Sequence, residues 1–369
     1  MIIKEPEVIS EESPISEAHP TLPDGVLNAL IQSQLRSSLK GSGHHALLIA
    51  GPAGSGQLEI GLTLAKAWLC ESPLLARTEG EPCGHCQSCR WVGDIDPRED
   101  TYFPVHPDLL FLRPEADDPH WEPAPGQSKT VKPSKEIKIK QVRDSASFVT
   151  LSAQRGAAKV VLVSPAEALN HESANSLLKM LEEPAGQCRF ILVSEHLDWL
   201  LPTIRSRCQM LSVNVPEHGQ ALAWLLQFGM PSNLAQELLA LVGGAAYGVL
   251  QLVKRNQSTT HRVFLESLCT MPEASLSQVS AQLAALEAPM LSRLLQSWIS
   301  DLIRAKLGQP VRFFPVHSGA VAKRAQQTSL QALSQLEGEW RALPKLAEHP
   351  LNPRLYVEGL LLRYCELFP

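Results

Sequence analysis

The chain has 369 residues and a net charge of −5, with 19% charged and 44% hydrophobic residues. This composition excludes a disordered chain, and the length exceeds one hydrophobic core, so two or three domains are expected. No apolar run approaches the ~18 residues of a membrane span, and the acidic first twenty residues are unlike a signal peptide. We therefore expect a cytoplasmic protein without a uniformly nucleic-acid-binding surface.

In chain order, residues 1–24 form an acidic N-terminal extension. Residues 25–216 follow, in which short β-prone runs alternate with helical stretches, a pattern typical of an α/β fold with a parallel sheet covered on both faces. Residues 114–136 are poor in apolar side chains and are predicted to form an exposed loop. The expected strands are 46–50, 109–113, 159–163, 189–194 and 209–213.

The first strand leads into a glycine-rich segment, Gly51 to Leu58, with the frame of a phosphate-binding loop. In an active loop a lysine reaches the β- and γ-phosphates and a Ser or Thr hydroxyl binds Mg²⁺. Gln57 and Leu58 occupy those two positions here. Ser164 stands where the third strand should end in an acid that holds Mg²⁺. The sequence therefore predicts a protein that has an ATP-binding fold but does not hydrolyse ATP.

Two alternatives to a fully inactive loop stay open. Glu167 lies three residues beyond the end of the strand and could replace the missing acid, although the intervening proline turns the chain away. The loop glycines Gly51, Gly54 and Gly56 could also hold a nucleotide passively, since backbone N–H groups at a helix N-terminus bind phosphate without lysine.

Four of the eight cysteines have the spacing C-x12-C-x2-C-x2-C, namely Cys70, Cys83, Cys86 and Cys89. Two-residue spacings let one tight turn deliver several thiolates to a zinc ion, and in a reducing cytoplasm such clusters are metal sites more often than disulfides. His85 is a competing ligand whose side chain should point away. Four protein ligands leave no open position, so the expected zinc is structural; the alternative is four unrelated thiols.

Two segments are candidates for DNA contact. Residues 129–143 carry six basic side chains against one acid, although a solvated linker is the favoured interpretation. A helix over 170–183 offers the phosphate-binding groups Ser173, Asn175 and Lys179 on a polar face for which plain solvation is an equal alternative.

Strand signals disappear after residue 216. Residues 217–258 are predicted to form a small helical lid, in which two consecutive glycines, Gly243 and Gly244, separate two helices. Residues 259–369 carry apolar residues at helical spacing and are predicted to form an all-helical domain. No arrangement of Ser, His, Asp or Cys suggests a nucleophilic enzyme.

Several motifs together resemble the AAA+ subunits of bacterial clamp loaders. With the phosphate loop degenerate, the likeness is to the delta-prime subunits of DNA polymerase III, and it runs from about Gly25 to the C-terminus. Besides the loop and the cysteine cluster, the motifs are Gly43–Leu48, His106–Asp108, Ala174–Pro184, Leu201–Cys208 and Asn352–Tyr364.

The resemblance implies an AAA+ module, a lid and a C-terminal collar for oligomerisation, through which five subunits form an open ring around primer-template DNA. The implied partners are ATPase motor subunits and a delta subunit in a hetero-pentamer, with the sliding clamp contacted indirectly. Arg207 would act as an arginine finger on ATP bound by the neighbouring subunit, the alternative being a surface ion pair. Tyr247 stands where active subunits carry a lid arginine, so ATP binding is not expected.

Two other functions remain as alternatives. An active AAA+ ATPase of a clamp or helicase loader would need a lysine at position 57 and an aspartate at position 164, and both are absent. A zinc-dependent DNA-binding regulator would need a basic cysteine loop, but only Arg77 and Arg90 lie close to it.

Overall fold

The computed structural model describes most of the chain beyond residue 43. The predicted N-terminal extension, 1–24, lies outside the described residues, as do 129–131 of the basic segment. The described ranges are 44–73, 81–93, 105–118, 121–122, 132–155, 158–184, 186–255, 257–270, 276–284, 286, 288–341, 343 and 352–368.

A five-stranded, all-parallel sheet forms the first part of the molecule, with strand order β2-β3-β4-β1-β5. The central strands are buried on both faces, which is why they read as continuous apolar runs in the sequence. The predicted strands are confirmed to within one residue at each end. Their bounds are β1 Ala46–Ala50, β2 Leu109–Leu112, β3 Lys159–Val163, β4 Cys188–Ser194 and β5 Gln209–Ser212.

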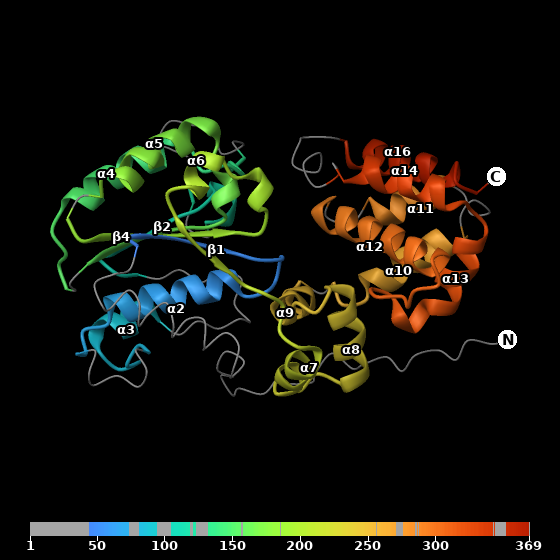
Figure 1. Ribbon diagram of the computed structural model, residues 1–369, viewed down its shortest axis with the longest axis horizontal. Coiled ribbons are helices and arrows are strands. Elements are labelled where there is room, and N and C mark those ends of the chain that lie inside the picture. Colours follow the sequence, from blue (N-terminus) through green and yellow to red (C-terminus); the bar gives the residue numbers. More distant parts are fainter. Residues whose placement is uncertain are drawn as a thin grey trace.

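Helices cover both faces of this sheet (Figure 1). One face carries α2 (Gln57–Leu69), which continues from the glycine loop, and the short α3 (Gln87–Val92) packs beside it. The other face carries α4 (Ile139–Thr150), α5 (His171–Glu182) and the single turn α6 (Pro202–Arg205). Each face has its own apolar core, so the predicted two-sided α/β architecture is confirmed.

The rest of the described chain is helical, as predicted. In Figure 1 three short helices, α7 to α9, lie between the sheet and the remaining helices. The chain turns between α8 and α9 at Gly243 and Gly244, whose φ angles of 68° and 98° are left-handed and favour glycine. The bounds of the helices after the sheet are α7 His218–Leu226, α8 Ser232–Leu241, α9 Ala246–Lys254, α10 Thr260–Thr270, α11 Leu276–Leu283, α12 Ala288–Lys306, α13 Ser318–Gln326, α14 Leu330–Trp340 and α16 Pro353–Cys365.

A polar joint connects α8 to α10. Glu237 of α8 lies 2.7 Å from Nε2 of the buried His261 and accepts a 2.9 Å hydrogen bond from Arg262. These contacts hold the pKa of Glu237 down to about 2, chiefly through the hydrogen bond from His261. The joint therefore fixes the short helices to those that follow by charge-assisted hydrogen bonds.

Within the described residues, no single helix has the length and apolarity to cross a membrane, while the bent pair α8 and α9 meets those criteria by length and composition when taken together.

Candidate functional site

The glycine loop sits at the carboxyl end of β1 and runs into α2. Gly56 precedes the helix with φ 89°, and Gln57 begins it. The amide Nε2 of Gln57 donates two hydrogen bonds back into the loop, to the carbonyl oxygens of Gly51 and Pro52, both at 2.6 Å. Leu58 packs against the apolar core. The residue at the lysine position is thus buried and satisfied inside its own loop.

The lid helix α9 closes over this loop. The backbone N–H of Gly248 donates to the carbonyl oxygen of Gly54 at 3.1 Å. The ring of Tyr247 lies directly on Gly56, since a Cβ atom placed there would come within 2.7 Å of the ring. Tyr247 is 4% exposed, and burial raises the pKa of its hydroxyl. The ring therefore lies against the N-terminus of α2, where backbone N–H groups would face a phosphate.

Glu167, the carboxylate considered as a replacement for the missing acid, is bound elsewhere. Glu167 does not stand at the end of β3; its Oε1 accepts hydrogen bonds from the backbone N–H groups of Glu195 and His196 at 2.9 and 3.2 Å. Burial raises the pKa of Glu59, in the first turn of α2, to about 7, whereas Glu195 lies on the surface. The carboxylate weighed as a metal ligand is used to hold the segment that follows β4.

A cavity of about 340 Å³ remains beside the loop, between α9 and α12. The loop lines it with Pro52, Ala53 and Gly54, and α12 contributes Arg293 and Leu294. Gly56, Gln57 and Leu58 are not among its lining residues. This space therefore opens on the outer side of the loop and not on the N-terminus of α2.

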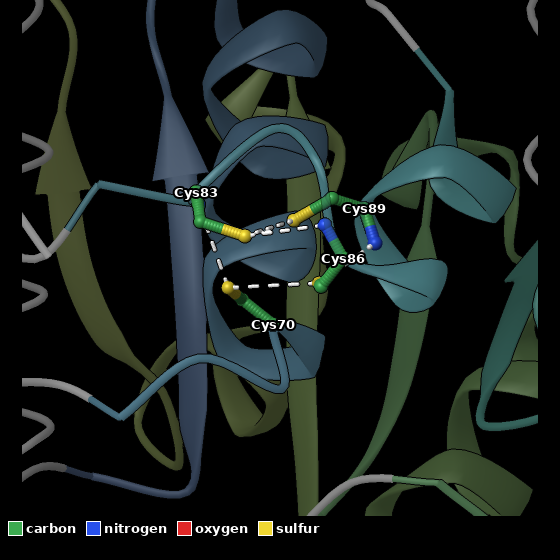
Figure 2. A group of neighbouring side chains, drawn as sticks. All are labelled: Cys70, Cys83, Cys86 and Cys89. Atoms are coloured by element: carbon green, nitrogen blue, oxygen red, sulfur yellow. Dashed lines mark hydrogen bonds between the residues drawn. The ribbon is translucent and has the colours of Figure 1, made fainter. Parts of the chain in front are cut away.

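The four predicted zinc ligands come together at the end of α2 and the start of α3 (Figure 2). Their sulfur atoms all lie within 4.8 Å of one another, and Cys83–Cys89 and Cys70–Cys86 each have Sγ atoms 3.9 Å apart. A tetrahedral ion with Zn–S bonds of about 2.3 Å requires S···S distances of about 3.8 Å. The donor set and its spacing fit a zinc ion.

Local hydrogen bonds favour a thiolate at Cys83, whereas burial raises the pKa of the Cys89 thiol. The backbone N–H groups of Cys83, Cys86 and Cys89 donate to the preceding cluster sulfurs at 3.3 to 3.4 Å. A hydrogen bond from Ser72 is the main cause that lowers the pKa of the Cys83 thiol to about 5. His85 lies outside the cluster, because its Nδ1 is bound to the carbonyl oxygen of Cys83 at 2.7 Å.

A buried polar network ties the cysteine module to the sheet. Ser88, between two of the ligands, donates to Glu71 at 2.8 Å and lies 2.9 Å from Nε2 of His106. Asp108, two residues further on, is fully buried and accepts from the backbone N–H groups of Gln154 and Arg155 at 2.7 and 2.8 Å. His106 and Asp108 were predicted only as part of a motif. Two polar residues just before a buried strand are the local signal that marks them.

Arg207 follows α6 and lies on the surface, with its side chain 35% exposed. Its NH1 group donates to the carbonyl oxygen of Thr203 at 3.1 Å, and its NH2 group forms an ion pair with Glu182 at the end of α5. The surface ion pair weighed as an alternative is thus present in the isolated chain. Glu182 belongs to the motif Ala174–Pro184 that carries the family resemblance, but the sequence alone assigns it no partner.

The three DNA-contact candidates on α5 differ in accessibility. Ser173 is fully buried, and its hydroxyl donates to the carbonyl oxygen of Ile137 at 2.6 Å. This geometry does not suit a phosphate contact. Asn175 and Lys179 are exposed, and Asn175 lies 3.0 Å from Nδ1 of His171 through its amide nitrogen.

A glycine loop at the end of β1, on a parallel sheet with helices on both faces, and a helical lid that covers the loop define a protein of the AAA+ class. The family model described as "DNA polymerase III, delta subunit" matches residues 27–217, more than half of the chain. The chain belongs to the family of DNA polymerase III delta-prime subunits, within the clamp-loader proteins.

Individual relatives agree with this family. DNA polymerase III subunit delta' of Pseudomonas aeruginosa is 37% identical over 218 residues, which cover 58% of this chain and 58% of that protein. The Escherichia coli subunit delta' is 27% identical over 327 residues, 88% of this chain and 89% of that protein. The Escherichia coli subunit tau is 31% identical over 210 residues, 56% of this chain and 28% of that protein. The match thus spans less than two thirds of the Pseudomonas relative.

Proposed function

We propose that this chain is a non-hydrolysing subunit of a clamp loader that supplies Arg207 to ATP bound by a neighbouring subunit. The observation that carries the proposal is a contrast within one molecule. Gln57 and Tyr247 fill and cover the chain's own phosphate loop, whereas the guanidinium of Arg207 reaches the surface. A guanidinium supplied from outside a site stabilises charge on the transferred phosphoryl group.

The closed loop also bears on passive nucleotide binding. A phosphate at the N-terminus of α2 would have to displace the Tyr247 ring and would approach the first turn of the helix, where burial raises the pKa of Glu59 to about 7 and so disfavours a further negative charge. Ser164 supplies no carboxylate for Mg²⁺. We propose that the chain binds no ATP, which argues against an active ATPase subunit.

Membership of the clamp-loader family supports a proposal about partners. We propose that residues 25–216 form the AAA+ module, 217–258 the lid and 259–369 the collar of a hetero-pentamer with ATPase motor subunits and a delta subunit, which loads a sliding clamp on primed DNA. Asn175 and Lys179 are the exposed groups of α5 that would face DNA phosphates. Cys70, Cys83, Cys86 and Cys89 would hold one structural zinc.

Reconstitution with partner subunits tests the role of Arg207. Arg207→Ala should leave the chain folded and able to join the ring, but it should lower hydrolysis at the neighbouring site by roughly 10³-fold. Bulk DNA-stimulated ATPase should fall only in part, because the other sites keep their own arginines. Clamp loading should fall further, since one stalled site blocks a concerted cycle.

Arg205→Ala is the matched control, because Arg205 is exposed two residues earlier and carries the same charge. It should load clamps at the wild-type rate. Arg207→Lys should rescue poorly, since an ammonium cannot reproduce the planar fork of a guanidinium. Wild-type loading by rings that carry Arg207→Ala would refute the proposed role.

A further inference from the structure

Arg207 is held by two elements at once. Thr203, in α6, accepts a hydrogen bond from its NH1 group, and Glu182, in the last turn of α5, pairs with its NH2 group. The two helices lie side by side on the same face of the sheet (Figure 1). The guanidinium therefore has a defined orientation even though its side chain is long and partly exposed.

These contacts leave part of the guanidinium for another partner. A guanidinium carries five N–H donors in a rigid fork. Thr203 and Ser206 accept from the NH1 nitrogen of Arg207, and Glu182 pairs with NH2, whereas Nε takes part in none of these contacts. Its side chain remains 35% exposed with these contacts in place. A phosphate brought up by a neighbouring molecule can thus be met without breaking the pair with Glu182.

The ion pair between Arg207 and Glu182 is also weak enough to orient the arginine without preventing it from contacting another partner. Both partners are more than one third exposed, at 35% and 47%, and exposed ion pairs contribute little free energy. A free arginine side chain samples many rotamers, and a finger must give up that freedom when it meets the transition state. A contact that restricts the rotamers beforehand removes part of this entropic cost.

We infer that Glu182 is a positioning residue, which orients Arg207 towards the phosphoryl group of ATP held by the neighbouring subunit. The inference rests on the proposed function of Arg207. It has a definite sign: removal of the Glu182 carboxylate should slow hydrolysis at the neighbouring site. If the ion pair instead kept Arg207 away from the ATP of the neighbouring subunit, removal of the carboxylate would speed hydrolysis.

The test uses reconstituted rings in which only the neighbouring subunit is competent for hydrolysis, the other motor subunits carrying alanine in place of the phosphate-loop lysine. Glu182→Gln should lower kcat for ATP by roughly 3- to 10-fold and leave KM unchanged, because the arginine acts on the transition state and not on bound substrate. Glu183→Gln, the same change one residue along the chain, is outside the pair and should leave kcat unchanged.

A double-mutant cycle separates this inference from the proposed function. In an Arg207→Ala background, Glu182→Gln should have no further effect, because the group that it orients is gone. A normal rate with Arg207→Ala alone would overturn the proposed function. A loss with Arg207→Ala but an unchanged or raised rate with Glu182→Gln would overturn only the positioning role, as would equal losses from Glu182→Gln in both backgrounds.

Discussion

A single glutamine accounts for much of the state of the phosphate loop. The side chain of Gln57 is neutral and does not require an anion such as phosphate as its partner. Its Nε2 group donates hydrogen bonds to two carbonyl oxygens of the loop. A lysine at the same place would bring a charge that is costly to bury without an anionic partner. The substitution thus lets the loop exist in a satisfied form without a ligand.

This arrangement predicts that restoring the lysine alone does not restore an ATPase. Gln57→Lys should give no ATP turnover in the isolated chain, because Tyr247 still covers Gly56 and no side chain is in place for Mg²⁺. Steady-state hydrolysis and binding of a fluorescent ATP analogue measure the two effects. Gln57→Lys combined with Tyr247→Ala is the companion variant, expected to gain weak binding without turnover. Metal-dependent hydrolysis by the single variant would contradict the prediction.

At the residue scale, the sequence was informative wherever a chemical role has a fixed place in a motif. Gln57 and Ser164 could be recognised because strand, loop and helix set the frame in which a lysine and an acid are expected. The packing of Tyr247 on Gly56 could not, because it joins two distant segments through tertiary structure. The pair of Arg207 and Glu182 is likewise a contact between helices that no local pattern encodes.

The cysteine module is the element whose stability depends most on a ligand. Helix α3 has only six residues, fewer than an isolated helix needs to persist in water. Two cluster cysteines lie just before α3 and one lies in its first turn, so a bound zinc would fix the N-terminal part of the helix to the end of α2. Spacing alone predicted this cluster, because two-residue intervals constrain a turn locally.

Removal of the metal should therefore destabilise α3 while the sheet stays folded. The purified chain should carry near one zinc per molecule by elemental analysis, and Cys86→Ser should lower this content and increase hydrogen exchange over residues 83–93. Acid should release the ion as well, because thiolates must be deprotonated to bind it. Cys269→Ser, outside the cluster, should change neither measurement. A reduced wild-type protein without zinc would show that the cluster is not a metal site.

Across the whole molecule, the strands were predicted closely and the relations between parts were not. Buried strands and helical periodicity are local patterns, so their positions follow from short stretches of sequence. The joint of Glu237, His261 and Arg262 depends on how α8 meets α10, and nothing in either segment alone indicates it.

This joint makes the stability of the molecule depend on pH in the acid range. The pKa of Glu237 is lowered from 4.5 to about 2, so its carboxylate stabilises the folded chain above pH 4.5, and this contribution is lost as the pH falls towards 2. Glu237→Gln should cost about 2 kcal/mol of unfolding free energy at pH 7, and the cost should shrink over that acid range. Urea unfolding at pH 7 and pH 3 measures the difference.

Glu217→Gln, at the exposed start of α7, is the control that removes the same charge without touching the joint. Its unfolding free energy should stay within about 0.5 kcal/mol of wild type. An equal loss of unfolding free energy for Glu237→Gln at both pH values would mean that side-chain packing, and not charge, holds α8 and α10 together.

The covered phosphate loop has a consequence for how a ring containing this chain would respond to the cell. If the chain binds no ATP, as we propose, its conformation would not depend on the ratio of ATP to ADP, because Gln57 and Tyr247 already fill and cover the loop. A compound that competes with ATP would then inhibit the proposed neighbouring motor subunits and leave the conformation of this chain unchanged.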